Sequence, residues 1–417
     1  MIGEVQPRFL RGLNNSLNLP MQQKQIIIIG GGPAGLMAAD VLSATHDVCL
    51  YDKEKNVGQK FLLAGKGGFN ITNSAQGEEL ISKYSPDGFM NKALSDFDTS
   101  ALRQWLAAMN IPTFVGSSGR VFPEKGIMPI DVLNKIRTKL VNQGVQIHNE
   151  HEFVGFDNNR HVTLKHHEKE IIAEADYILF ALGGASWPVT GSNGAWQPIF
   201  ESMGIATSPF QSSNCGVNIS WPEGFRQSHA GKPVKNIRLF TGDFEVRGEA
   251  VITDYGLEGN AVYPMVPSIR NMLNSKAPAY LHIDFKPLNP EAHLLMKIKG
   301  KTVTTKDYGR LFNLSPVQLA LIKAFTDKDS FLSVPRFIAS IKNLAIPVDS
   351  LRPLEEAIST IGGIRTEEVN DDFSLKKYPW IYVMGEMLDW DAPTGGFLIQ
   401  GCFSMGHYAA HAIMGKE

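Results

Sequence analysis

The sequence of 417 residues contains few cysteines, no long apolar run and almost no net charge. Its three cysteines, Cys49, Cys215 and Cys402, are far apart and form no Cys-x-x-Cys pair, which excludes a disulfide framework and a dithiol redox centre. We expect free, buried thiols in a reducing compartment. The eleven histidines show no metal-ligand spacing, so no metal site is predicted.

The net charge of −2 provides no overall electrostatic footprint for nucleic acid, although a local basic groove stays open as an alternative. No membrane partner is expected either. A spanning helix needs about 18 consecutive apolar residues, and the run from Ile26 is interrupted by four glycines and a proline. Because residues 1–20 lack the apolar centre of a signal peptide, we predict a cytoplasmic protein. Arg8 and Arg11 leave an organelle-targeting segment as the alternative.

A glycine-rich turn follows the first β-branched run. Ile26–Ile29 is typical of a strand buried on both faces of a parallel sheet, and three glycines follow it in G-x-G-x-x-G spacing. Such glycines make the tight turn, let the backbone approach a pyrophosphate and let the next helix pack closely on the strand. The helix N-terminus favours phosphate, and a proline suits its first turn. The predicted dinucleotide-binding residues of this turn are Gly30, Gly32, Pro33, Ala34 and Gly35.

An acidic residue ends the second predicted strand, "DVCLYD". This residue is Asp52, 22 positions after Gly30, where dinucleotide folds place the carboxylate that accepts hydrogen bonds from the adenosine ribose. Glu54 is the alternative. A carboxylate at this position repels a 2′-phosphate, so the turn is expected to hold FAD or NAD rather than NADP.

Three further segments favour FAD over NAD. A second glycine-rich loop spans 58–73, where a nicotinamide dehydrogenase would continue to its next strand and helix. The strand-like run within 175–194 ends in two glycines, which suits close passage along a cofactor. Near the C-terminus, Gly385 and Glu386 follow a strand, and 394–396 precede an apolar helix. The N–H groups of that helix are expected to point at the flavin pyrimidine edge and to favour the anionic reduced flavin.

These segments supply the remaining candidate FAD ligands. Glu386 is the preferred partner of the ribityl chain, with Asp389 and Asp391 as alternatives. The polar residues of the 58–73 loop hydrogen-bond the flavin or, alternatively, form turns that shape the loop. The full set of candidates is Asp52, Lys60, Gly65, Gly67, Asn70, Thr72, Asn73, Gly183, Gly184, Gly385, Glu386, Thr394, Gly395, Gly396 and Phe397.

At four stretches the sequence resembles the aminoacetone oxidase family FAD-binding enzymes, also called BaiN/RdsA-type NAD(P)/FAD-dependent oxidoreductases. The stretches are Gly30–Leu36, Gly58–Asn73, Gly183–Ser186 and Gly385–Gly396, and the resemblance runs over nearly the whole chain after Met21. It implies one FAD wrapped by these segments, and a C-terminal segment that completes the nucleotide domain around an inserted substrate domain.

The sequence departs from the family pattern at three places. The usual Gly-Gly-Gly-Arg-Cys-Asn loop is replaced at 65–70 by Gly-Lys-Gly-Gly-Phe-Asn, which introduces Lys66. Pro393 replaces an acidic residue, and Asp254 stands where many relatives carry histidine. We interpret these changes as the mark of a separate branch.

The predicted fold class is α/β, a Rossmann-type FAD-binding domain with an inserted β-rich and helical substrate domain. Residues 22–207 and 356–417 are assigned to the FAD-binding domain and 208–355 to the insert. Within the insert, 208–262 and 333–355 are expected to be β-rich, with short runs separated by Pro and Gly. The segment 263–332 is expected to be helical, with Ser315 as an N-cap.

The predicted function is flavin hydride transfer to or from a small-molecule C=C or C–N bond. FAD supplies this chemistry, and reduction of an alkene or enone also needs an acid that protonates the second carbon. Asp254 and Tyr255 are candidates for that acid or for a substrate anchor, with turn capping and packing as the alternative. Lys66 is a candidate for stabilising negative charge on the reduced flavin or substrate, unless it is a solvated loop lysine.

NAD(P)H is a candidate transient electron donor, although the chain has no second G-x-G-x-x-G motif for it. Two alternative functions stay open. One is an RNA-modifying flavoenzyme that reduces uridine, with a local groove formed by basic residues of the insert. The other is a non-catalytic FAD-binding redox partner. The basic residues considered for the groove are Arg226, Lys232, Lys235, Arg238 and Arg247.

Overall fold

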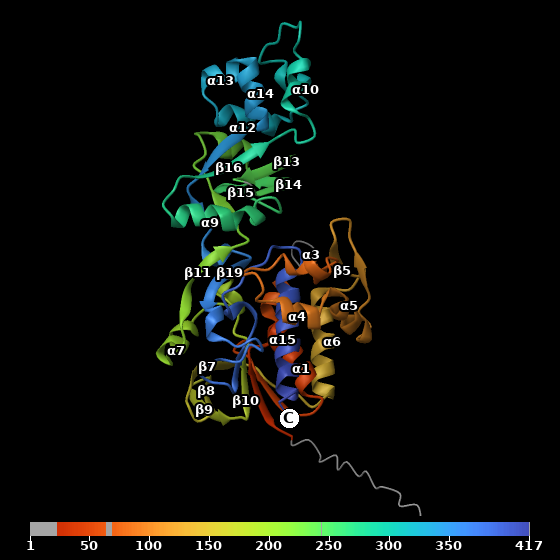
Figure 1. Ribbon diagram of the computed structural model, residues 1–417, viewed down its shortest axis with the longest axis vertical. Coiled ribbons are helices and arrows are strands. Elements are labelled where there is room, and N and C mark those ends of the chain that lie inside the picture. The colour runs from red at the N-terminus through yellow and green to blue at the C-terminus, as the bar shows by residue number, and fades with distance from the viewer. Residues whose placement is uncertain (1–22, 64–68, 243, 417) are drawn as a thin grey trace, which may run out of the picture.

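The computed structural model describes residues 23–63, 69–242 and 244–416. Figure 1 shows two bodies along the long axis of the molecule, each with its own sheet. Each body also has its own buried apolar cluster, one formed by residues between 26 and 205 and between 364 and 413, the other by residues between 217 and 348. The predicted limits at 207/208 and 355/356 fall between these clusters and stay predictions.

A five-stranded parallel sheet forms the centre of the body that contains residues 26–205 and 364–413, called the FAD-binding body after its predicted role. Its central strand is the apolar run predicted from the sequence, and all four isoleucines of that run are buried. The C-terminal strand β20 pairs with β10, so the end of the chain returns to the first sheet and the Rossmann-type fold is confirmed. The strand order is β20 (Ile381–Val383), β10 (Tyr177–Phe180), β1 (Gln25–Ile29), β2 (Asp47–Tyr51) and β6 (Gln146–His148).

Helices cover one face of this sheet, where α1 (Pro33–Leu42), α15 (Phe397–Met414) and α6 (Pro129–Asn142) lie side by side (Figure 1). On the other face, the antiparallel meander β7–β9 packs through aromatic contacts of Phe153 and Phe156 with Phe180. The smaller elements of this body are β7 (His151–Phe156), β8 (His161–His166), β9 (Lys169–Glu174), α2 (Gln59–Leu63), α3 (Gly77–Ile81), α4 (Asn91–Asp96), α5 (Thr99–Ala108) and α7 (Gln197–Ser202).

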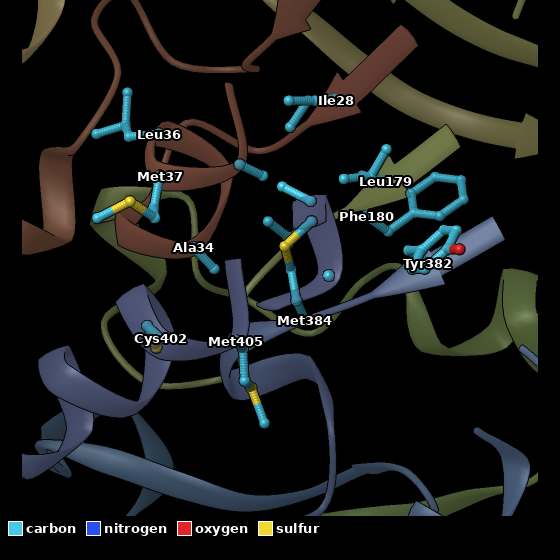
Figure 2. Packing of buried hydrophobic residues seen from close by; sticks show 14 of the residues in the cluster. Ile28, Ala34, Leu36, Met37, Leu179, Phe180, Tyr382, Met384, Cys402 and Met405 are labelled. Atoms are coloured by element: carbon cyan, nitrogen blue, oxygen red, sulfur yellow. The ribbon is translucent and has the colours of Figure 1, made fainter. Parts of the chain in front are cut away.

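The contact between α1 and α15 depends on a glycine. Figure 2 shows the apolar packing around this contact, with Ala34 of α1 near Cys402 of α15. A Cβ atom on Gly406 would lie 2.2 Å from the backbone oxygen of Ala34, so the two helices approach too closely for any side chain at this position. This close contact fixes α15, and therefore its N-terminal end, relative to the glycine-rich turn that precedes α1.

We expect Gly406→Ala to destabilise the protein by about 1–3 kcal/mol, because the added methyl group must push the backbone of α1 away. The measurement is urea unfolding followed by circular dichroism. Gly309→Ala is the matched control, since the nearest atom to its added Cβ is 3.7 Å away. A Gly406→Ala protein as stable as this control would show that the helices can separate without cost.

A seven-stranded sheet forms the centre of the insert, and its neighbouring strands are antiparallel. The order is β17 (Leu344–Val348), β16 (Ala279–Asp284), β13 (Pro233–Thr241), β14 (Phe244–Ile252), β15 (Gly256–Glu258), β12 (Val217–Asn218) and β18 (Ser350–Leu351). The helices are α8 (Phe225–His229), α9 (Val266–Asn274), α10 (Glu291–Met296), α11 (Tyr308–Leu311), α12 (Pro316–Ala324), α13 (Lys328–Leu332) and α14 (Val334–Lys342).

The insert corrects part of the predicted layout. The segment 263–332, expected to be helical, also contains β16, whose alternating buried side chains pair it with β13 and β17. The segment 333–355, expected to be β-rich, begins with α14. The predicted N-cap is confirmed, because the Ser315 hydroxyl accepts a hydrogen bond from the N–H of Gln318.

Two antiparallel strands connect the bodies. The chain enters the insert through β11 (Thr207–Ser213) and leaves it through β19 (Ser359–Ile364), and the two are paired in register at Ser213 and Ser359. A three-stranded sheet of β3 (Thr72–Asn73), β5 (Arg120–Pro123) and β4 (Thr113–Val115) lies against the N-terminal end of α15.

Candidate functional site

A cleft of about 470 Å³ opens at the carboxyl ends of β1, β2 and β10. Its wall includes the glycine turn 30–34, residues 51–54 after β2, the segment 58–61, residues 181–183 after β10, and the pair Gly385–Glu386. The structure therefore brings together residues from each of the four stretches that the sequence analysis assigned to the cofactor. The edge formed by strand carboxyl ends is where α/β folds bind nucleotides.

The three glycines of the turn are needed for different physical reasons. Gly30 has φ +105°, and a Cβ there would lie 2.2 Å from the backbone oxygen of Ala181. A Cβ on Gly35 would lie 2.0 Å from the oxygen of Gly30, which explains the tight helix packing. A Cβ on Gly32 would meet no atom within 4 Å. Gly32 lines the cleft and precedes Pro33 at the start of α1, so it leaves space at a helix N-terminus where a pyrophosphate fits.

Asp52, which directly follows β2, binds the backbone of the glycine turn. Its carboxylate accepts hydrogen bonds from the N–H of Gly31 at 2.7 Å and from the N–H of Glu54 at 2.8 Å. Burial raises the pKa of Asp52, and these two backbone hydrogen bonds act in the opposite direction. The side chain therefore orders the glycine turn as well as standing at the predicted ribose position, and its contact with ribose stays a prediction.

Lys60 and Glu386 meet on the wall of the cleft, although 326 positions separate them. The ammonium group of Lys60 donates to the Glu386 carboxylate at 2.6 Å and to the buried Ser186 hydroxyl at 2.7 Å. Cys402 also lines this part of the cleft, and burial raises the pKa of its thiol well above the ordinary value. The sequence predicted both charged residues as FAD ligands but gave no signal for their pairing.

A second group of predicted residues meets at the N-terminal end of α15. The Thr72 hydroxyl donates to the side-chain oxygen of Gln400 at 2.6 Å, and the Asn73 amide donates to the backbone oxygen of Gly395 at 3.1 Å. Gly396 has φ +97°, and a Cβ there would lie 2.4 Å from the backbone of Thr72. Thus β3 and the 394–396 turn are held in direct contact, and their binding to FAD stays a prediction.

Comparison with known proteins identifies the protein family. The family model described as HI0933-like protein Rossmann domain matches residues 24–412. The chain belongs to the HI0933-like family. Membership makes it an enzyme of the FAD-dependent oxidoreductase class, in agreement with the resemblance and the class predicted from its sequence.

Two curated relatives of this HI0933-like chain align over nearly their whole length. The chain is 24% identical over 416 residues to a 3-dehydro-bile acid delta(4,6)-reductase of Clostridium scindens, covering 93% of this chain and 98% of the relative. It is 22% identical over 411 residues to a ribosomal RNA dihydrouridine synthase of Haemophilus influenzae, covering 94% and 99%. A 3-ketosteroid delta1-dehydrogenase from Sterolibacterium denitrificans shares the fold, with a TM-score of 0.50, 11% identity and coverage of 95% and 100%.

Two of the candidate catalytic residues of this HI0933-like protein, Asp254 and Tyr255, do not line the cleft. Asp254 is exposed on the turn between β14 and β15. The neighbouring Tyr255 donates its hydroxyl to Glu258, and the guanidinium of Arg352 lies 4.1 Å from its ring centre. Their catalytic roles stay predictions. Lys66, Gly65 and Gly67 lie outside the described residues.

The remaining predicted FAD ligands lie near the cleft wall or near the contact between β3 and the N-terminal end of α15. Gly183 lines the cleft with φ +73°, and a Cβ on Gly184 would lie 2.2 Å from the Thr360 hydroxyl. Phe397 begins α15, and its backbone oxygen accepts a hydrogen bond from the Tyr84 hydroxyl. Asn70 is half-buried just before β3.

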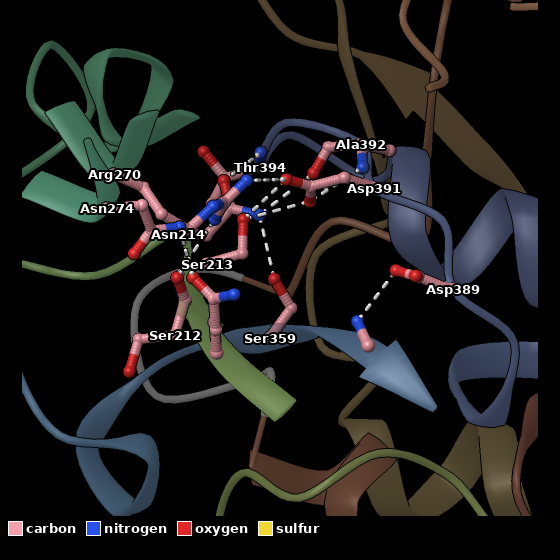
Figure 3. Close-up of polar contacts among 12 residues, drawn as sticks. Ser212, Ser213, Asn214, Arg270, Asn274, Ser359, Asp389, Asp391, Ala392 and Thr394 are labelled. Carbon is pink, nitrogen blue, oxygen red and sulfur yellow. Dashed lines mark hydrogen bonds and ion pairs between the residues drawn. The ribbon is translucent and has the colours of Figure 1, made fainter. Parts of the chain in front are cut away.

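The two alternative ribityl ligands instead make structural contacts at the base of the insert, which Figure 3 shows. Asp389 accepts a hydrogen bond from the N–H of Gly362 at 2.8 Å. Asp391 accepts hydrogen bonds from the Ser213 hydroxyl and pairs with Arg270 of α9 at 3.4 Å. Glu386 lines the cleft, whereas these two carboxylates are occupied elsewhere, so Glu386 remains the candidate ribityl partner.

Asn214 joins the same junction to the turn before α15. Its amide nitrogen donates to the Ser359 hydroxyl and to the backbone oxygen of Ala392, both at 2.8 Å. Its amide oxygen accepts from the N–H of Thr394 at 3.1 Å. Thr394, another predicted FAD ligand, is therefore positioned by the residue that directly follows β11 (Figure 3).

Two absences complete the description. Within the ranges that the structure describes, no group of three or more His, Cys, Asp or Glu side chains is arranged to bind a metal ion. None of the helices in the described part of the chain is long and apolar enough to cross a membrane.

Proposed function

We propose that the protein binds one FAD along the cleft and transfers a hydride to or from a C=C or C–N bond of a small molecule. The observation that carries this proposal is the open position at Gly32, which lies on the same cleft wall as Asp52 and the Lys60–Glu386 pair. The bile-acid reductase among the relatives is named for the reduction of a small molecule, and it aligns over almost the whole chain.

We assign the parts of FAD in order, from the glycine turn of the cleft to the N-terminal end of α15. The turn from Gly30 to Gly35 would hold the pyrophosphate on the N–H groups of α1, and Asp52 would accept hydrogen bonds from the ribose. Glu386 would bind ribityl hydroxyls while Lys60 keeps its carboxylate oriented. The turn 394–396 would place the N-terminal end of α15 at the flavin edge, where its dipole favours negative charge. FAD supplies hydride-transfer chemistry when it is bound.

A proton donor is needed if the reaction reduces an alkene or enone. We propose Asp254 and Tyr255 for this role. Burial, followed by the hydrogen bond to Glu258, raises the pKa of Tyr255, so its hydroxyl keeps its proton at neutral pH. We expect the double variant Asp254→Asn/Tyr255→Phe to bind FAD normally and to lose turnover, measured under multiple-turnover conditions. Normal turnover would remove both residues from the mechanism.

The electron donor is proposed to be NADH or NADPH, bound transiently beside the cofactor because the chain has no second dinucleotide turn. The test is an anaerobic absorbance spectrum of the FAD-loaded protein before and after each nucleotide, followed by admission of air. Bands that bleach and return support a flavoenzyme with a nicotinamide donor. Bands unaffected by both nucleotides contradict the donor, and a protein that takes up no FAD contradicts the proposed function.

A second candidate, reduction of uridine in RNA, is favoured by the charge of the insert. The segment 286–342 carries ten Lys and Arg but four Asp and Glu, whereas the whole chain has a net charge of −2. Two of the basic residues that the sequence suggested for an RNA groove are neutralised by ion pairs. Lys235 pairs with Glu249, and Arg238 pairs with Glu245 and Asp284. The relative from Haemophilus influenzae is a ribosomal RNA dihydrouridine synthase.

RNA binding is tested by fluorescence anisotropy with a ribosomal RNA fragment at increasing salt. If RNA is the substrate, affinity falls steeply with salt, and replacing the exposed lysines Lys299, Lys301 and Lys306 with glutamine lowers the salt slope. Replacement of the exposed Lys169, which lies in β9 of the other body, is the control. Equal binding by both variants contradicts the RNA candidate.

A further inference from the structure

Arg120 stands where three parts of the chain meet. It begins β5 and pairs with Asn73 of β3, the strand that contacts the turn before α15. Its Nε atom lies 3.7 Å from the position of a Cβ on Gly395. Its Nη2 atom donates a hydrogen bond of 2.8 Å to the side-chain oxygen of Asn260, which belongs to the insert. Arg120 therefore spans from the FAD-binding body to the insert beside the N-terminal end of α15.

The partner of this guanidinium is a neutral amide. Among the ion pairs of the residues that the structure describes, none includes Arg120, so no described carboxylate neutralises its charge. Arginine presents five N–H donors in a planar fork suited to oxygen acceptors. Asn260 is exposed, and a single hydrogen bond to an exposed amide is readily exchanged for another acceptor.

We propose that Arg120 binds an electron-rich oxygen of the substrate, a carbonyl or a carboxylate, between Gly395 and the insert. Asn260 holds the guanidinium in the absence of that oxygen. This inference rests on the proposed function and names the substrate class of the same site. It makes Arg120 a substrate-binding residue that the sequence analysis did not identify.

The charge of Arg120 suits the chemistry of such a substrate. When a hydride adds to the β carbon of an enone, the C=C electrons shift and the carbonyl oxygen becomes an enolate oxygen. The α carbon then takes a proton and the carbonyl is restored, so the alkene gains one hydride, which carries two electrons, and one proton. The reductant of the proposed function supplies the hydride. A guanidinium fixed beside the oxygen stabilises the negative charge where it develops.

The test uses the FAD-loaded full chain and sulfite, an anion that adds reversibly to protein-bound flavin and bleaches its absorbance. The variants are Arg120→Gln, Arg120→Lys and Asn260→Ala, with Arg247→Gln on the exposed edge of β14 as the control. FAD content, the sulfite dissociation constant and the flavin midpoint potential are measured for each protein, so that no substrate needs to be known in advance.

We expect Arg120→Gln to weaken sulfite binding about tenfold or more and to lower the midpoint potential, because a positive charge near the flavin is lost. Arg120→Lys restores most of the affinity. Asn260→Ala binds sulfite at least as tightly as the wild type, because its amide no longer competes for the guanidinium, and Arg247→Gln matches the wild type. If Arg120→Gln keeps the wild-type sulfite affinity and flavin midpoint potential, the inference about Arg120 is overturned and the proposed function is not. A wild-type protein that binds no FAD overturns the proposed function and the inference with it.

Discussion

Replacing Gly32 with valine is expected to abolish FAD binding while the protein stays folded. Gly32 has φ −80° and ψ −178°, an extended conformation that valine adopts without strain. A Cβ there meets no protein atom within 4 Å, so the new side chain enters the open space of the cleft. The branched side chain then blocks the approach of a pyrophosphate to the backbone of the turn.

We expect FAD affinity to fall at least 100-fold, equivalent to about 2.7 kcal/mol or more. Equilibrium titration by flavin fluorescence measures the affinity, and thermal unfolding of the FAD-free protein measures the fold. Gly35→Val is the contrasting variant, because a Cβ there lies 2.0 Å from the backbone oxygen of Gly30 and destabilises the fold itself. Wild-type affinity in Gly32→Val would place the cofactor phosphates away from this turn.

Among the proposed substitutions, replacement of Arg270 at the base of the insert is expected to lower the free energy of unfolding most. Arg270 is 7% exposed, and it donates to the backbone oxygen of Ser212 at 3.0 Å besides pairing with Asp391. Arg270→Met leaves the Asp391 carboxylate buried without its cation, which costs about 3–5 kcal/mol when the carboxylate is charged. Urea unfolding at neutral pH measures this loss.

The loss depends on pH in a defined direction. Burial raises the pKa of Asp391 above its ordinary value, whereas the Ser213 hydroxyl and Arg270 act to lower it. Removing Arg270 raises this pKa further. A carboxyl whose pKa is higher in the folded state favours folding at low pH, and this contribution is lost as the pH rises through the folded-state pKa. Arg270→Met is therefore expected to approach wild-type stability in acid and to fall behind it toward neutral pH.

The double variant Arg270→Met/Asp391→Asn separates the ion pair from simple packing. With the carboxylate replaced by a neutral amide, we expect most of the stability lost in Arg270→Met to return and its pH dependence to disappear. If Arg270→Met lost the same stability at every pH, the loss could not be assigned to the charge of Asp391.

The sequence predicted those parts of the site that depend on local geometry. The turn after Ile29 was recognisable from its glycine spacing, because such glycines occupy positions where a Cβ atom would clash with the backbone. The short distances at Gly30 and Gly35 agree with that reasoning. Asp52 was found for a similar reason, since its position is counted from the turn along one strand and helix. Both depend on chain segments that are close in sequence.

Contacts between distant segments could not be predicted in the same way. Lys60 reaches Glu386 because β20 pairs with β10, and nothing in either segment records this strand order. Arg120 was missed because its importance comes from the insert's Asn260, 140 positions away. The strand β16 had a local signal, since its buried residues alternate with more exposed ones, but helical stretches on both sides concealed it.

The paired strands at the base of the insert have an evolutionary consequence. Ser213, where the chain leaves the FAD-binding body, lies opposite Ser359, where it returns. A segment with adjoining ends can be lengthened, shortened or exchanged without changing the order of the parallel sheet. New substrate preferences can therefore arise by recombination or drift within one continuous stretch of the gene, while the nucleotide-binding machinery is inherited unchanged.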